Sequence, residues 1–83
     1  MKIKPLRQDL IEYLIAHKLV SKYQKVSALF QSNIRHPSLN VELMEPKWHG
    51  IYSFRIDRKY RALFFFTKKD LIEVFSVTNH YKK

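Results

Sequence analysis

The segment Gly50-Ile-Tyr-Ser-Phe-Arg-Ile-Asp-Arg-Lys-Tyr-Arg61 has the clearest structural pattern in the chain. Within it, residues 51–56 form two alternating sets of side chains, one of them wholly apolar, and this is the period of a β-strand. Residues 57–59 are a polar interruption with the length of a hairpin turn, and a second apolar run follows over residues 60–67. The sequence therefore predicts an antiparallel β-hairpin with its turn at 57–59.

Two arginines would meet across this hairpin. Arg55 and Arg61 would lie opposite or diagonal to each other, where like charges repel and weaken the pairing. A sheet that keeps such a pair has a use for an anion there, and phosphate is the leading candidate because guanidinium groups bind it bidentately. Two solvated arginines near a strand end are an equally weighted alternative.

The rest of the chain reads as helices first and strands afterwards. Apolar residues recur at helical spacing in residues 6–18 and again in 21–34, and a short turn joins the two segments into an antiparallel helical hairpin. Strands are expected at residues 2–4, 41–44, 60–67 and 71–78. Trp48 is expected in the core, with a stacking platform for RNA as the less favoured alternative. This order indicates an α+β fold in which an N-terminal helical hairpin packs on a twisted antiparallel β-sheet.

Composition limits the function. The 83 residues fit one domain spanning 1–83, and 16 Lys and Arg against 7 Asp and Glu give a net charge of +9. Such a surplus predicts a polyanionic partner: nucleic acid, the ribosome or an acidic protein. No cysteine, one glycine and four scattered histidines give no basis for a metal site, a glycine-rich phosphate loop or a cofactor. No apolar run spans a bilayer and the start lacks the core of a signal peptide, so a cytoplasmic protein without a membrane partner is expected.

A candidate site for chemistry forms if residues 60–67 pair with residues 71–78. Arg61 then lies beside the end of the last strand, His80 emerges within its reach, and Glu42 approaches from the preceding strand. A carboxylate, arginines and a histidine around one phosphate are the minimum for metal-free RNA cleavage by the ribose 2′-OH. The plain alternative is that Glu42 is a solvated strand residue and that His80 belongs to a frayed chain end.

These residues occur in an order that resembles the RelE/ParE toxin superfamily. The pattern runs through Trp48-His49-Gly50, Ser53-Phe-Arg55-Ile56 and Tyr60-Arg61, and it ends on His80-Tyr81. The connector His36-Pro37-Ser38-Leu39 also fits. The terminal His-Tyr is similar to the end of YoeB-like toxins, which are ribosome-dependent mRNA endonucleases, whereas the ParE branch poisons DNA gyrase.

The resemblance implies a role for each matching residue. The catalytic set would be Glu42 as general base, Arg61 as transition-state stabiliser, His80 as general acid and Tyr81 as an orienting residue. Arg55 falls at a second family arginine. We also expect Arg55, Lys47, Arg58 and Lys59 to bind the substrate. Glu45 and Lys47 remain alternatives to Glu42 as the base.

The resemblance also implies partners. It makes the chain the toxin of a type II toxin–antitoxin system, which binds a cognate antitoxin in a hetero-oligomer and acts on mRNA in the ribosome. Two other classes of function stay open on the sequence. One is a gyrase-binding toxin without nuclease activity, and the other is a regulatory RNA-binding module that cleaves nothing.

Overall fold

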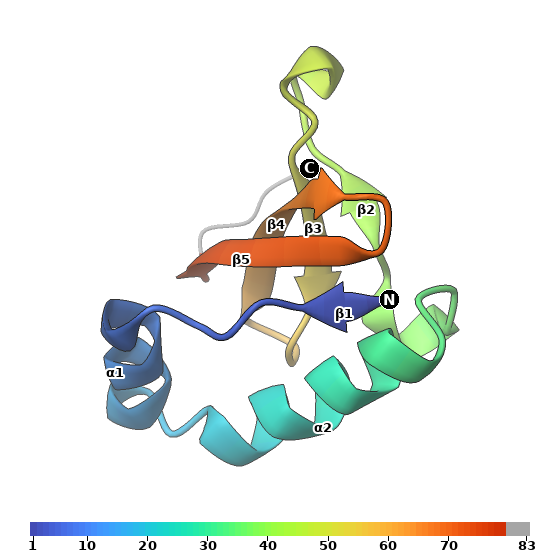
Figure 1. The fold of residues 1–83 in the computed structure, drawn as a ribbon. Coiled ribbons are helices and arrows are strands. Elements are labelled where there is room, and N and C mark those ends of the chain that lie inside the picture. The colour runs from blue at the N-terminus through green and yellow to red at the C-terminus, as the bar shows by residue number, and fades with distance from the viewer. Residues whose placement is uncertain (80–83) are drawn as a thin grey trace.

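The computed structural model of the chain describes residues 1–79 and has an α+β fold, with two helices against one face of a five-stranded sheet (Figure 1). In chain order the elements are β1 (Lys2–Ile3), α1 (Gln8–Ala16), α2 (Val20–Ser32), the 3-10 turn η1 (Pro37–Leu39), β2 (Glu42–Leu43), the 3-10 turn η2 (Lys47–His49), β3 (Tyr52–Arg55), β4 (Arg61–Lys68) and β5 (Leu71–Thr78). The strand order across the sheet is β1-β5-β4-β3-β2. The predicted fold class is confirmed.

The sheet is mixed rather than wholly antiparallel, which corrects the expectation from the sequence. β1 pairs with β5 in the parallel direction, with Lys2 opposite Leu71. The backbone N–H of Lys2 donates to the carbonyl of Asp70 at 2.8 Å, and that of Lys4 donates to the carbonyl of Ile72 at 2.9 Å. A two-residue strand contains too little pattern to encode its direction, so its pairing is decided by the path of the chain into α1.

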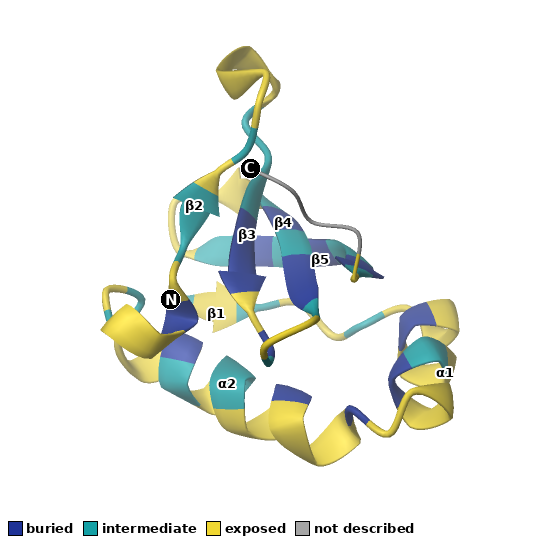
Figure 2. Cartoon of the chain, turned by 180° about the vertical axis from the view of Figure 1, so that it is seen from behind, coloured by how far each residue is buried: buried dark blue, intermediate teal, exposed yellow. Residues whose placement is uncertain are grey.

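The hydrophobic core lies between the helices and the sheet, and Figure 2 shows it along the inner sides of the helices and in β3 and β4. Phe30 of α2 is fully buried, and its ring centroid lies 5.0 Å from that of Phe54 and 5.3 Å from that of Phe64. Burying a phenylalanine side chain contributes about 1.5–3 kcal/mol, so this trio ties α2 to the middle of the sheet. Within residues 1–79, no helix has the length and apolar content that crossing a bilayer requires.

The central hairpin has one of the two arrangements expected from the sequence, with the two arginines directly opposite each other. Arg55 lies directly opposite Arg61 in the β3–β4 pair, and Arg61 lies directly opposite Thr78 in the β4–β5 pair. Asp57 fastens the turn between β3 and β4, because its Oδ1 accepts two backbone N–H hydrogen bonds of the turn, both at 2.9 Å. The pairing therefore keeps two like charges opposite each other at one end of the sheet.

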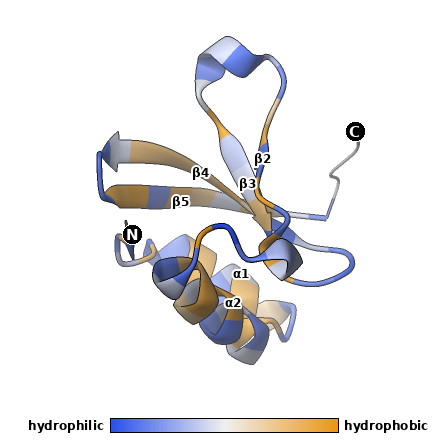
Figure 3. Ribbon diagram, turned by 90° about the vertical axis from the view of Figure 1, so that its right-hand side faces the viewer, coloured by the Kyte–Doolittle hydropathy of each residue, from blue (hydrophilic) through white to orange (hydrophobic). Residues whose placement is uncertain are grey.

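The β2–β3 connection projects beyond the sheet as a tip loop, residues 44–51, with η2 at its end (Figures 1 and 3). The N–H of Met44 closes the loop by donating to the carbonyl of Ile51 at 2.7 Å. Gly50 follows η2 at φ 69°, a conformation that glycine adopts without strain. Trp48 in this tip loop is 82% exposed, so the expectation that it joins the core is wrong. The projecting loop carries its side chain away from the sheet.

Candidate active site

One face of the sheet bears the polar side chains that the sequence singled out. Residues directly opposite each other in antiparallel strands have side chains on the same face. Ser53 lies opposite Glu42, Arg55 opposite Arg61, and Arg61 opposite Thr78. Their neighbours along β3 and β4 are buried against the helices, and side chains alternate between faces. These five side chains therefore lie on the face away from the helices, here called the open face.

The side chain of Arg61 is held at the open face by hydrogen bonds to one edge of its guanidinium group. Its Nε donates to the Oγ of Ser53 at 2.9 Å, and its Nη2 donates to the carbonyl of Ser53 at 3.3 Å and to the carbonyl of Asn40. Ser53 is fully buried and Arg61 is only 4% exposed. Asn40 follows η1 with a left-handed backbone at φ 45°, so the connector between α2 and β2 also positions the guanidinium.

A carboxylate and a second arginine surround this guanidinium. The Oε2 of Glu42 lies 3.8 Å from the Nη2 of Arg61. The pKa of Arg61 is lowered, chiefly by burial; Glu42 raises it and Arg55 lowers it further. Arginine nevertheless stays protonated in proteins. The result is a fixed cation in a poorly hydrated place, where its charge acts more strongly on an approaching anion than it would in water.

The structure brings part of the predicted set of site residues together. Glu42, Arg55 and Arg61 share the open face at one end of the sheet. Arg58 and Lys59 are exposed in the turn that directly follows β3, next to the arginine pair in the chain, and they line a hollow of about 450 Å³ that also borders the helices. The cations assigned to substrate binding therefore gather around this end of the hairpin, with one exception.

That exception is Lys47, which the structure separates from the arginine pair. Lys47 and Glu45 are exposed in the tip loop, beyond the opposite end of β3 from Arg55. His80 and Tyr81 lie outside the described residues. Of the three candidates for the base, only Glu42 is placed at the guanidinium of Arg61.

Sequence reasoning missed two groups of the site. Ser53 gives Arg61 its buried hydroxyl acceptor, and the sequence held a signal for it: Ser53 is two positions before Arg55 on the same strand face, where a buried serine needs a hydrogen-bond partner. Asn40 acts through its backbone carbonyl, so no side-chain pattern pointed to it. In the part of the chain that the structure describes, no three His, Asp or Glu side chains are grouped so that they could hold a metal ion.

Solved structures of toxins share this fold. A YoeB/ParE toxin from Agrobacterium tumefaciens superposes with a TM-score of 0.70 at 19% sequence identity, covering 98% of this chain and 100% of that one. A chain of the heterotetrameric YoeB-YefM toxin-antitoxin complex from Staphylococcus aureus gives 0.66 at 20% identity, covering 96% and 94%. A second YoeB-YefM complex from that organism gives 0.61 at 21% identity with the same coverage. No family model and no curated protein matches the chain.

These structural likenesses define the class of fold. They extend over nearly the whole of each chain, at sequence identities of 19 to 21% that establish the fold and nothing beyond it. The resemblance to the RelE/ParE superfamily is thus confirmed at the level of the fold. The chain has the fold of YoeB/ParE toxins.

Proposed function

We propose that this chain is the toxin of a type II toxin–antitoxin system and that it acts as a metal-independent, ribosome-dependent mRNA endoribonuclease. One observation carries the proposal: the carboxylate of Glu42 lies 3.8 Å from the buried guanidinium of Arg61, with Arg55 directly opposite, in a chain with the fold of YoeB/ParE toxins. In such a reaction a carboxylate can accept the proton, and fixed cations beside it can stabilise the charge that develops on the phosphate.

The proposed reaction is attack of a ribose 2′-OH on the adjacent phosphorus. Glu42 takes the proton of the 2′-OH, and the bond to the 5′-oxygen breaks as the new bond to phosphorus forms, which leaves a 2′,3′-cyclic phosphate. Arg61 stabilises the charge on the phosphoryl oxygens. His80 gives a proton to the leaving 5′-oxygen and Tyr81 orients the phosphate, roles that the resemblance assigns to residues outside the described part of the chain.

The anchoring of Arg61 supports its proposed role. Because Ser53 and Asn40 already hold its Nε and Nη2, the guanidinium needs no rearrangement when negative charge develops on the phosphate. Arg55, Arg58 and Lys59 supply further positive charge for the RNA backbone at the same end of the sheet.

The proposed partners are an antitoxin, in a hetero-oligomer, and the ribosome with its mRNA, all in the cytoplasm. Two of the structures that share the fold are complexes named as toxin with antitoxin, and a chain of net charge +9 suits an acidic partner segment as well as ribosomal RNA. The ribosome would present the mRNA in reactive geometry, so cleavage of free RNA should be much weaker.

The test is to express the chain in growing cells and map mRNA 5′ ends with and without a translation inhibitor. The wild type should arrest growth and create new 5′ ends only while translation runs. Glu42→Gln keeps the shape of the side chain and removes the base, so the cleavage rate should fall by about 10²–10⁴-fold. Glu42→Gln is preferred to Arg61→Ala, because truncating a buried, hydrogen-bonded arginine also threatens the fold.

Glu45→Gln is the matched control, since it makes the same change in the exposed tip loop. It should cleave like the wild type. Undiminished cleavage by Glu42→Gln, or equal loss in both variants, contradicts the assignment of the base. Growth arrest with a DNA-damage response and intact translation would instead identify a gyrase-binding toxin.

A further inference from the structure

The β2–β3 and β4–β5 hairpins of the sheet diverge (Figure 3), and the hollow between them is here called the cleft. Pairing between β3 and β4 ends where Tyr52 lies opposite Phe64, whereas β4 continues to Lys68 paired with β5 alone. Between the start of β3 and the outer half of β4 and β5 lies a hollow of about 640 Å³. That volume is within the range of small-ligand sites in proteins.

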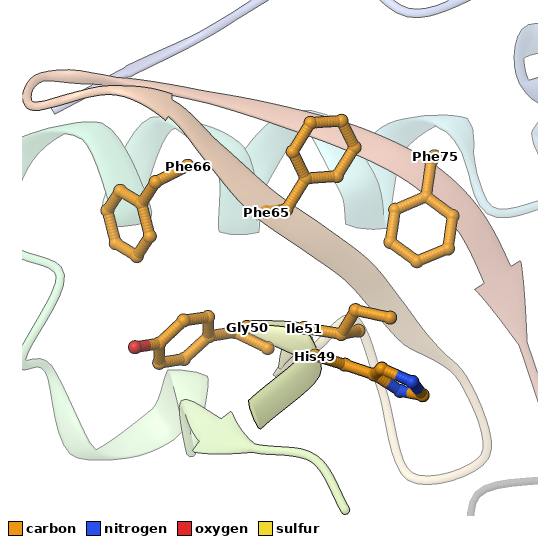
Figure 4. Close-up of a pocket in the computed structure, with 7 residues that line it drawn as sticks. His49, Gly50, Ile51, Phe65, Phe66 and Phe75 are labelled. Atoms are coloured by element: carbon orange, nitrogen blue, oxygen red, sulfur yellow. The ribbon is translucent and has the colours of Figure 1, made fainter. Parts of the chain in front are cut away.

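Aromatic side chains line both sides of this cleft (Figure 4). The β4–β5 side contributes Phe65, Phe66 and Phe75, with 5.7 Å between the ring centroids of Phe65 and Phe75. Tyr52 of β3 lines the other side, and its ring centroid lies 5.3 Å from that of Phe66. Phe66 is 41% exposed and the other three rings are half-buried. Partly exposed rings on paired strands offer rigid surfaces on which a planar ligand can stack.

The cleft lies in line with the proposed active site. Arg61, Leu63 and Phe65 alternate along β4, so their side chains share the open face. At about 3.3 Å per residue, Phe65 lies ~13 Å along the strand from Arg61. A chain molecule held by its phosphate at Arg61 would therefore reach the cleft along the same face.

Positive charge flanks the cleft at both hairpin ends. Lys47 is exposed in the tip loop, and Lys68-Lys69 is exposed at the β4–β5 turn. Glu73, which lies opposite Phe65 on β5, is ion-paired with Lys4 at 3.2 Å. Exposed aromatic rings flanked by positively charged side chains are the arrangement that proteins use to bind single-stranded nucleic acids.

Trp48 stands next to the cleft as a further stacking surface. Its ring packs on that of His49 with 4.0 Å between the centroids, and His49 lines the cleft. The turn is held by the N–H of His49, which donates to the carbonyl of Pro46 at 3.1 Å, and by the N–H of Gly50, which donates to that of Lys47 at 3.2 Å. A hydrogen-bonded loop thus presents an indole that is 82% exposed.

We infer that the cleft binds unpaired bases of a single-stranded RNA whose backbone continues to Arg55 and Arg61. The bases stack on the exposed faces of Phe65 and Trp48, and the flanking lysines contact phosphates. This inference rests on the proposed function, which supplies the RNA, and it adds the surface that positions the strand beside the scissile phosphate.

Trp48 is the single tryptophan of the chain and packs against His49 of the cleft, so its fluorescence reports on a ligand bound at that side of the cleft. The probe is a short 2′-O-methylated oligoadenylate, which has no 2′-OH and cannot be cleaved by the proposed reaction. Titration of the full chain should quench the fluorescence to saturation. An abasic oligomer of the same length and charge should bind about tenfold more weakly without quenching, because stacking supplies the difference.

Variants separate stacking from charge. Trp48→Ala should weaken oligoadenylate binding about tenfold, measured by fluorescence anisotropy of a labelled oligomer, with the same salt dependence, while Trp48→Phe should retain most of the affinity. Replacing Lys68 and Lys69 together by alanine removes two phosphate contacts, so the negative slope of log K against log salt should become shallower by about 1.4. Ile15→Ala is the matched control, because Ile15 is also an exposed apolar residue, 60% exposed on α1, and should change nothing.

Equal affinity for the abasic oligomer, or unchanged binding by Trp48→Ala, would overturn the inference. Quenching by an acidic amphipathic peptide but not by RNA would overturn it in favour of a protein segment. The two proposals can be distinguished. If the chain cleaves no mRNA in cells but still binds oligoadenylate more tightly than the abasic oligomer, the nuclease proposal is wrong and the inference about the cleft stands. If the chain cleaves mRNA but binds the two oligomers equally, only the inference about the cleft is wrong.

Discussion

At the scale of single residues, Arg61 links the stability of the fold to the proposed chemistry. A buried cation destabilises a protein unless acceptors and counter-charge replace the water that it has lost. Here Ser53, the Asn40 carbonyl and Glu42 do so. Variants at this cluster should therefore affect folding as well as activity, and the two effects have to be measured separately.

Ser53→Ala tests the anchoring of Arg61. It removes a buried acceptor of a charged donor, and such hydrogen bonds are worth about 1.5–3 kcal/mol, so the free energy of unfolding should fall by that amount. Urea unfolding followed by circular dichroism measures it. Ser76→Ala, at a half-buried serine of β5, is the control and should cost ~0.5 kcal/mol or less. Equal midpoints for Ser53→Ala and wild type would show that the anchor is unimportant.

Tyr23→Phe tests a different kind of residue. Among the described residues, the hydroxyl of Tyr23 is buried without a hydrogen-bond partner, and burial raises its pKa to about 12. Removing an unsatisfied hydroxyl relieves a desolvation cost, so the variant should be as stable as the wild type or up to about 1–3 kcal/mol more stable. Thermal unfolding measures this, with Tyr13→Phe as the half-buried control. A clear loss of stability would reveal a partner for the hydroxyl.

At the scale of elements, the β3–β4 turn makes a pH-dependent contribution through Asp57. Burial raises the pKa of Asp57, but hydrogen bonds from Lys22 and from the backbone of Lys59 and Tyr60 outweigh it, so the pKa is lowered. In the unfolded chain the pKa is about 3.9. A group with a lower pKa in the folded state stabilises the protein above its unfolded pKa, and this contribution is lost as the pH falls through the folded pKa.

Asp57→Asn should remove that pH dependence, while the side-chain carbonyl of the introduced asparagine still accepts hydrogen bonds in the turn. The wild type should be the more stable at pH 7, and its advantage should shrink as the pH falls from about 5 towards 3. Urea unfolding at several pH values measures it, with Asp70→Asn in the exposed β4–β5 turn as the control for losing a surface carboxylate. An advantage that stays constant down to pH 3 would contradict the assignment.

The elements also show what could be predicted from the sequence. The two-residue period and the turn around Asp57 predicted Arg55 opposite or diagonal to Arg61, and the pairing of the last two strands predicted Val77 or Thr78 beside Arg61. The structure has Arg55 and Thr78 directly opposite Arg61. Glu42 was expected to approach from the preceding strand or its loop, and it lies on β2, opposite Ser53. These predictions succeeded because local pattern and strand pairing agree over several residues.

Other features depended on tertiary structure and were missed. The direction of β1 was missed because two residues have no usable period. Trp48 was expected in the core from its residue type, yet hydrogen bonds of the tip loop hold it outside. The Asn40 carbonyl was missed because a backbone acceptor leaves no trace in the sequence. In the candidate site, sequence therefore predicts the charged side chains that a sheet register collects, and it misses the acceptors that hold Arg61, the Ser53 hydroxyl and the Asn40 carbonyl.

At the scale of the whole molecule, the sheet separates two tasks. Its helix-covered face supplies the core, and its open face holds Arg55 and Arg61 at one end and Phe65 towards the other. With net charge +9 in a body of 32 × 26 × 25 Å, every charge acts on the others when salt is low, because the Debye length at 0.01 M is about 30 Å. Self-repulsion therefore destabilises the free chain, and a polyanion on the open face would relieve it.

Added sodium chloride should mimic that polyanion and raise the melting temperature of the free chain. At 0.15 M the Debye length shrinks to about 8 Å, so repulsion across the molecule is largely screened. The exposed ion pairs Lys4–Glu73 and Arg7–Asp9 weaken as well, but such pairs contribute little. A net gain of about 1 kcal/mol corresponds to ~4–8 °C for a domain of this size, measured by circular dichroism.

Replacing the exposed Lys25 and Lys69 by glutamine takes two charges from +9 and leaves +7, so the salt effect should become smaller. A melting temperature that falls with chloride would mean that ion pairs outweigh repulsion, and the free chain would then gain nothing in stability from covering its charge.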